Sequence, residues 1–138
     1  AMSMPTPREA VWAHLRAAPG IQALVGSRIY HQQAPPDATY PLIIINTISN
    51  IDRRDLAAVF ASQTRLQVSC IAASLKEAET LALAVRRSLD GFRGLMAGAL
   101  PVLEVTADRY EPVLVEETGY TSYDVDLLVL HKGVVTDG

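Results

Sequence analysis

One run of apolar residues constrains the fold of this chain more than any other feature. Leu42, Ile43, Ile44 and Ile45 follow one another and lead into Asn46-Thr47-Ile48. β-Branched side chains favour strands, and apolar residues at both odd and even positions are typical of a central strand covered on both faces. The sequence therefore predicts a strand over 42–48, and other elements must cover it.

The second strong pattern predicts an amphipathic helix. Ser74-Leu75-Lys76-Glu77 has the form of a capping box, and Asp90-Gly91 supplies the stop. Between them a single apolar stripe recurs at helical spacing, formed by Ala78, Leu81, Ala82, Val85 and Leu89. We expect this helix to pack on a sheet through the stripe.

Weaker signals complete the expected order of elements. Thr6-Pro7-Arg8-Glu9 is a second capping box and predicts a helix over about 7–17, followed by one short turn over 21–25. Short apolar or alternating segments predict further strands at 28–30, 63–72, 102–110 and 120–131. The predicted fold is α+β, in the order α-β-β-β-α-β-β, with two principal helices on one face of a mainly antiparallel sheet of four to five strands.

Length and composition indicate one globular domain. The 138 residues are 49% hydrophobic, which is enough for one core, and we expect a single domain over 1–138. Residues 1–5 and 133–138 are expected to be flexible, and Ala1-Met2 has the form of a cloning remnant. No apolar run approaches a membrane span, so no membrane partner is expected.

The charges are divided unevenly along the chain. The net charge is −3, which argues against a module that binds nucleic acid through phosphate neutralisation. Residues 1–100 hold ten Lys/Arg and seven Asp/Glu, whereas residues 101–138 hold two and eight. Two faces of opposite charge would suit head-to-tail association of identical copies, and the alternative is a split compensated within the fold.

No catalytic or metal-binding motif is readable. The three histidines, His14, His31 and His131, lack ligand spacing, and Cys70 lies among the apolar residues of a strand, where a buried hydrophobe is expected. Asp124 and Asp126 share one face of a strand, where two carboxylates could bind a cation or share a proton. Their alternation with apolar residues favours instead the exposed face of an edge strand or a strand lining a lumen. No metal and no cofactor is predicted.

The segment between the second and third strands is a candidate protein contact. Residues 49–61 are too many for a tight hairpin and are expected to project. Balanced charges favour contact with protein over nucleic acid, and the apolar residues must be covered either by the chain's own core or by a neighbouring subunit. The candidate interface residues here are Asp52, Arg53, Arg54, Asp55, Leu56 and Phe60.

The chain as a whole resembles the tail-completion, or tail-terminator, family of long-tailed phages. The similarity covers about residues 8–132 and lies in spacing and residue type rather than in a chemical motif. It is carried by the segments Gly26-Ser27-Arg28-Ile29-Tyr30, Ala34-Pro35, Tyr40 to Ile45, Thr64 to Val68, and Ala78-Glu79 through Ala84-Val85-Arg86 to Leu89-Asp90-Gly91.

The resemblance implies a structural virion protein without enzymatic activity, made in the bacterial cytoplasm. Relatives typically form a homo-hexameric ring on the head-proximal end of the tail tube, stop its polymerisation and present a surface to the head connector. DNA passes through the ring without specific binding. The acidic segment 111–119, with Glu111, Glu116 and Glu117, joins the first segment as a candidate contact, and Asp124 and Asp126 are candidates to line the channel.

Three other functions are alternatives for this sequence. One is another head-to-tail joining component of the same particle. A small ligand-binding or enzymatic α+β domain would require a concave pocket with convergent polar groups. A nucleic-acid-binding module would require a continuous basic face, which the charge balance disfavours.

Overall fold

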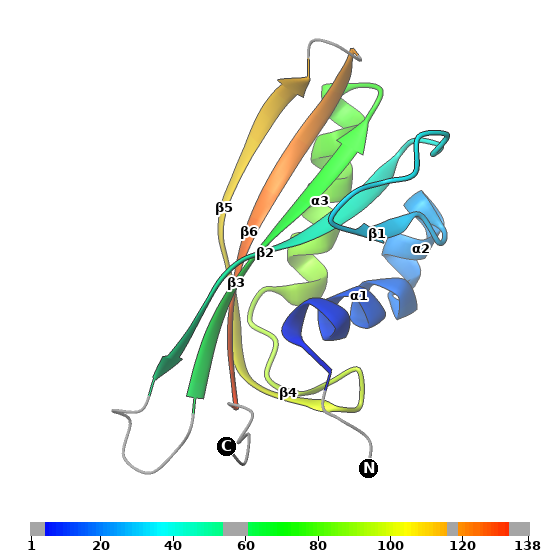
Figure 1. The fold of residues 1–138 in the computed structure, drawn as a ribbon. Helices are drawn as coiled ribbons and strands as arrows, with labels where there is room; N and C mark the ends of the chain where they lie inside the picture. The colour runs from blue at the N-terminus through cyan, green and yellow to red at the C-terminus, as the bar shows by residue number, and fades with distance from the viewer. Residues whose placement is uncertain (1–4, 54–60, 116–118, 133–138) are drawn as a thin grey trace.

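The computed structural model describes residues 5–53, 61–115 and 119–132. Three helices and six strands follow one another along the chain (Figure 1). They are α1 (Pro7–Ala17), α2 (Pro19–Val25), β1 (Ile29–His31), β2 (Leu42–Arg53), β3 (Ala61–Ala72), α3 (Leu75–Leu89), β4 (Gly94–Met96), β5 (Leu100–Val115) and β6 (Tyr120–Lys132).

The strands form one mixed sheet in the order β1-β2-β3-β6-β5-β4. The β2–β3, β3–β6, β6–β5 and β5–β4 pairs are antiparallel, and β1 lies parallel to β2 with Ile29 opposite Ile43. The α+β class is confirmed, but the expectation of a mainly antiparallel sheet of four to five strands is wrong, because the sheet has six strands and is mixed. The connection over 32–41 is long enough to bring the chain back beside β1 in the same direction.

The helices α1, α2 and α3 lie on the same face of the twisted sheet, and within residues 5–53, 61–115 and 119–132 the opposite face carries no helix (Figure 1). The core is the layer between helices and sheet. The fully buried side chains include Leu15 and Val11 of α1, Leu81 and Leu89 of α3, and the alternating residues Leu66, Val68 and Cys70 of β3. Ile43 and Ile45 of β2 are buried, whereas Ile44 is only partly buried, so the apolar run is covered most fully on its helical side.

Local capping explains why α1 and α3 begin where they do. The Thr6 hydroxyl accepts the Glu9 amide at 3.2 Å, and the Glu9 carboxylate accepts the Thr6 amide at 3.1 Å, which completes the predicted capping box. At α3 the Ser74 hydroxyl accepts the Glu77 amide at 3.2 Å. All five residues of the predicted α3 stripe are buried.

The long hairpins depart from the sequence-based expectation. β2 continues to Arg53 and β3 begins at Ala61, so the predicted projecting segment 49–61 begins and ends as strand, and residues 54–60 lie outside the described residues. In the same way β5 continues to Val115, so Glu111 lies in a strand and not in the expected loop. Polar residues such as Ser49 and Asn50 look like loop residues, but they continue the strand opposite Arg65 and Thr64 of β3.

Candidate assembly surfaces

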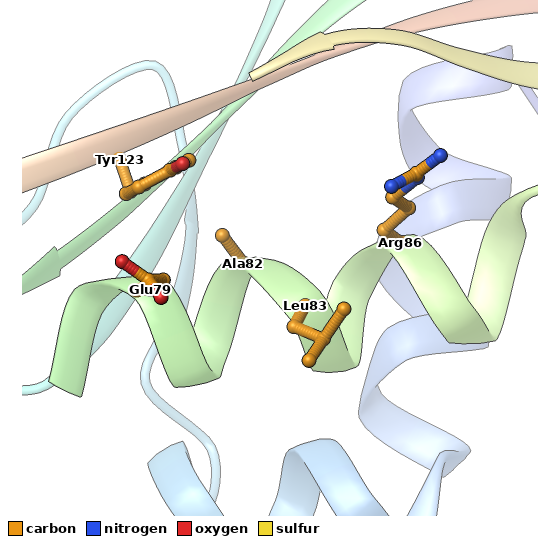
Figure 2. A pocket seen from close by; sticks show the side chains of 5 residues that line it. All are labelled: Glu79, Ala82, Leu83, Arg86 and Tyr123. Carbon is orange, nitrogen blue, oxygen red and sulfur yellow. The ribbon is translucent and has the colours of Figure 1, made fainter. Parts of the chain in front are cut away.

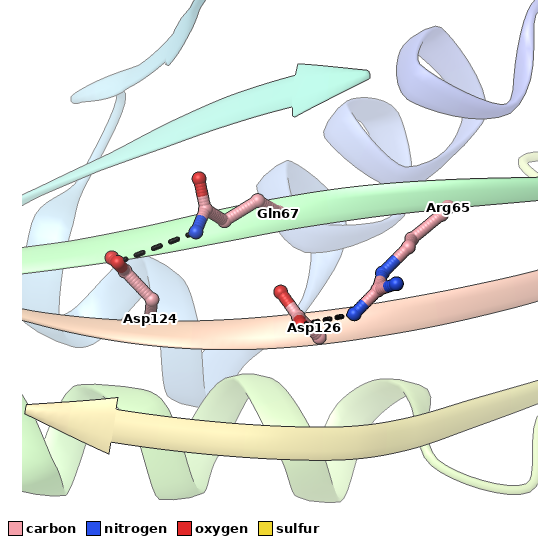
Figure 3. A network of polar contacts seen from close by, with 4 residues as sticks. All are labelled: Arg65, Gln67, Asp124 and Asp126. Carbon is pink, nitrogen blue, oxygen red and sulfur yellow. Dashed lines mark hydrogen bonds and ion pairs between the residues drawn. The ribbon is translucent and has the colours of Figure 1, made fainter. Parts of the chain in front are cut away.

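The open face of the sheet carries a polar row that joins β3 to β6. Arg65 donates to the Asp126 carboxylate at 2.9 Å, and the Gln67 amide donates to the Asp124 carboxylate at 3.4 Å (Figure 3). The Ser122 hydroxyl donates to the other Asp124 oxygen at 2.9 Å. Each bond joins residues that are diagonal neighbours in the register or two apart on one strand. The row is therefore built by strand pairing of segments about sixty residues apart in sequence.

These contacts describe the surroundings of Asp124 and Asp126. Each carboxylate has its own hydrogen-bonding partner, and an arginine neutralises the charge of Asp126. Within the part of the chain that the structure describes, no three His, Cys, Asp or Glu residues gather as metal ligands would. The pair belongs to a partly exposed, internally bonded surface of the sheet, and this surface is less acidic than the two aspartates alone suggest.

The predicted interface residues lie at opposite ends of the sheet. Asp52 and Arg53 are opposite Ser62 and Ala61 at the end of the β2–β3 hairpin. Glu111 is opposite Asp124 on β6, toward the end of the β5–β6 hairpin. Figure 1 shows the β2–β3 end at the bottom and the β5–β6 end at the top. The structure therefore does not bring the two groups together. Four further candidates on the first hairpin and two on the second lie outside the described residues: Arg54, Asp55, Leu56, Phe60, Glu116 and Glu117.

Large exposed apolar side chains mark surfaces that the sequence analysis did not single out. Ile48 and Ile51 of β2 are 53% and 55% exposed and lie near the end of this strand at Arg53. Others lie on α3, β4 and β5, namely Leu75, Leu83, Leu95 and Leu103. Of these exposed side chains, only the two on α3 could have been recognised from the sequence, because Leu75 and Leu83 fall outside the buried apolar stripe of that helix.

A hollow of about 230 Å³ lies between α3 and β6 (Figure 2). Glu79, Ala82, Leu83 and Arg86 line it from the helix, and Tyr123 lines it from the sheet. Figure 2 shows Glu79 and Arg86 separated along the helix, on either side of Ala82. Among the labelled side chains, those of Glu79 and Arg86 do not converge on one point.

The buried titratable groups serve the fold. Burial raises the pKa of the Cys70 thiol, and Asp124 adds to the effect, so this cysteine is a protonated hydrophobe, as expected. His131 is buried and contacts the Thr64 hydroxyl through Nε2 and the Lys132 carbonyl through Nδ1, both at 2.9 Å. His14 bridges α1 to the Ser88 carbonyl of α3 at 3.0 Å. His31 is exposed, and partial desolvation of its ring, followed by the nearby positive charge of Arg8, lowers the pKa of the imidazole.

Comparison with known families shows to which family the chain belongs. The family described as "Tail completion protein gp17" matches residues 9–126. The chain belongs to this family. It is therefore a structural protein of a phage-type virion tail.

A solved structure shares the fold of this tail completion protein. A chain of the structure described as "Virion of native gene transfer agent (GTA) particle" superposes with a TM-score of 0.78 at 21% identity, covering 92% of this chain and 95% of that chain. At this identity the similarity supports the fold alone. No curated protein matches the chain. Among the described residues, no helix has the length and apolar character to span a membrane.

Proposed function

We propose that this tail completion protein forms a homo-hexameric ring at the head-proximal end of the tail, ends the polymerisation of the tail tube and provides the surface to which the head connector attaches. The family match over residues 9–126 carries this proposal. Within the described residues, neither the hollow beside α3 nor the polar row offers a convergent set of catalytic groups, so nothing there favours an enzymatic alternative.

The two hairpins suit the contacts of a ring. A closed ring of identical subunits needs two different patches on each copy, placed so that one copy's first patch meets its neighbour's second. The β2–β3 end, with Asp52 and Arg53, and the β5–β6 end, with Glu111, are such a pair of unlike patches. Arg54, Asp55, Leu56, Phe60, Glu116 and Glu117, which follow these ends in sequence, belong to the proposed contacts with neighbours, tail-tube protein and connector.

The open face of the sheet is the proposed channel wall. Helices cover the other face, so a ring with helices outside would turn Asp124 and Asp126 toward the passing DNA (Figure 1). The two groups that donate to the Asp124 carboxylate, the Gln67 amide and the Ser122 hydroxyl, are neutral, so neither offsets the charge of a carboxylate at this position. A weakly acidic wall repels the DNA backbone and prevents binding during passage.

Imaging of tail tubes mixed with the purified protein tests the proposal. Rings at one end of each tube are the expected result, and no association at any protein concentration would contradict it. Arg53→Glu combined with Arg54→Glu is expected to leave the thermal unfolding midpoint nearly unchanged while reducing ring occupancy, since a basic contact becomes acidic. Arg53→Lys with Arg54→Lys is the charge-conserving control, and unchanged occupancy in the glutamate variant would remove this segment from the interface.

A further inference from the structure

Both edges of the sheet are only partly covered. β1 pairs with β2 at Ile43–Ile45, which leaves 46–53 of β2 without a strand on that side among the described residues. β4 pairs with β5 at Leu100–Val102, and the backbone of Gly91 and Phe92 then covers Val105. The Asp90 side chain accepts the Ala107 amide at 3.0 Å, so 108–115 of β5 is likewise uncovered. Within the part of the chain that the structure describes, each edge thus leaves eight residues of strand without a neighbouring strand on its outer side.

Hydrogen-bond alternation shows which backbone groups are free. On β2 the Ile43 amide and the Ile45 carbonyl face β1. The register shift between Thr47 and Ser49 inserts one extra residue into β2, so the outward-facing positions change from odd to even numbers after it. Alternate residues of an antiparallel strand bond the same neighbour, so the amides of Asn50 and Asp52 face away from β3. On β5 the groups of Val105 and Ala107 face outward, and the shift before Arg109 makes Tyr110, Pro112 and Leu114 the next outward residues.

The two uncovered edges complement each other in direction, and they meet when the second copy is displaced along the strands. The free part of β2 lies at the bottom of the sheet on one edge, and that of β5 lies at the top on the opposite edge (Figure 1). The strands β2, β3, β6 and β5 alternate in direction, so β5 of one copy runs antiparallel to β2 of a second copy placed beside it in the same orientation. The short strands β1 and β4 then lie beyond the two ends of the joint and do not obstruct it.

We propose that neighbouring copies join by adding the free edge of β2 in one copy to the free edge of β5 in the next, so that one sheet runs from subunit to subunit. With Asn50 opposite Pro112, each of these residues is the register partner of a residue on the helical side, Thr64 or Tyr123, so the helices of successive copies share one face. In this register Ile51 is opposite Glu111. This inference rests on the proposed ring and specifies how the ring is held together.

The sequence of the joint fits a reversible contact. Ile48 and Ile51 supply exposed apolar surface beside the β2 edge, and Val113, Leu114 and Val115 have high strand propensity. Pro112 removes one amide donor from the β5 edge, as edge prolines do where uncontrolled strand addition must be prevented. An edge with a missing donor favours assembly on the tube end, where neighbours are held at high effective concentration, over assembly in solution.

A cross-linking experiment tests the joint directly. Ile51→Cys protein and Glu111→Cys protein are mixed with tail tubes and oxidised; residues directly opposite on antiparallel strands are close enough for a disulfide. Covalent dimers are expected in the mixture and absent from either variant alone, since the contact joins unlike edges. Cys70 is fully buried and does not compete. Dimers from Ile51→Cys alone would overturn the proposal in favour of a two-fold β2–β2 contact, and no dimer in the mixture would overturn it as well.

A proline substitution distinguishes the proposed strand joint from the proposed ring formation. Asp52→Pro removes an outward amide while keeping the bonds from β2 to β3, and Asp52→Ala is the matched control that keeps the amide. We expect Asp52→Pro to lower ring occupancy on tubes by at least about tenfold relative to Asp52→Ala, because both variants lose the side chain but only the proline variant loses one backbone bond at every subunit contact. Full occupancy with Asp52→Pro would overturn the strand joint alone, whereas no rings with the unaltered protein would overturn the proposed function.

Discussion

Two leucines of α3 provide a matched test of how this helix lies on the sheet. Leu81 is 1% exposed and belongs to the buried stripe, whereas Leu83, two residues later, is 43% exposed beside the hollow facing Tyr123. Truncating either to alanine makes the same chemical change within the same helix. Any difference in stability between the variants therefore reports burial rather than helix propensity.

The expected magnitudes are well separated. Leu81→Ala removes a fully buried side chain and leaves a cavity, so it should lower the free energy of unfolding by about 2–5 kcal/mol. Leu83→Ala should lower it by less than about 1 kcal/mol, as surface substitutions do. With a slope of about 2 kcal/mol per molar urea for a small protein, Leu81→Ala should move the unfolding midpoint down by about 1–2.5 M.

Urea unfolding followed by two probes measures the difference. Circular dichroism reports the helices, and the fluorescence of Trp12, the single tryptophan, reports the docking of α1, because its indole donates to the Ile29 carbonyl at 2.9 Å. Coincident transitions would support two-state unfolding and make the comparison valid. Equal losses for the two variants, or a loss below about 1 kcal/mol for Leu81→Ala, would refute the packing described for α3.

Three further predictions concern single contacts. Hydrogen bonding from Thr6 holds the pKa of the Glu9 carboxyl below its ordinary 4.5, so the ionised carboxylate stabilises the fold above pH 4.5 and this stabilisation is lost as the pH falls through the lower folded-state pKa. Glu9→Gln should therefore flatten the acidic part of a curve of unfolding free energy against pH. An unchanged curve would count against the capping box. Cys70 should react with a thiol reagent only after unfolding, so fast labelling of the native protein would contradict its burial. Arg65 and Asp126 are partly exposed, so a double-mutant cycle should give a coupling of about 0.2–1 kcal/mol that shrinks with salt, and a coupling insensitive to salt would argue against a screened ion pair.

The sequence by itself determined the two principal helices and the burial of β3. Capping residues such as Thr6 and Ser74 act on amides three residues away, and the stripe of α3 repeats within fifteen residues, so both are local and readable. The alternation around Cys70 likewise assigns one side of β3 to the core without knowledge of its partners. Family membership was also readable from the spacing of these segments.

Only the tertiary structure decided the extent and edges of the sheet. Ser49 to Arg53 and Glu111-Pro112 have no strong strand pattern of their own, and they become strand because β3 and β6 pair with them. The partners of Asp124 and Asp126 come from β3, about sixty positions earlier in the chain, which no local pattern specifies. Strand pairing satisfies backbone groups between distant segments, so the register, the parallel β1 and the two unpaired edges depend on the whole fold rather than on any one segment.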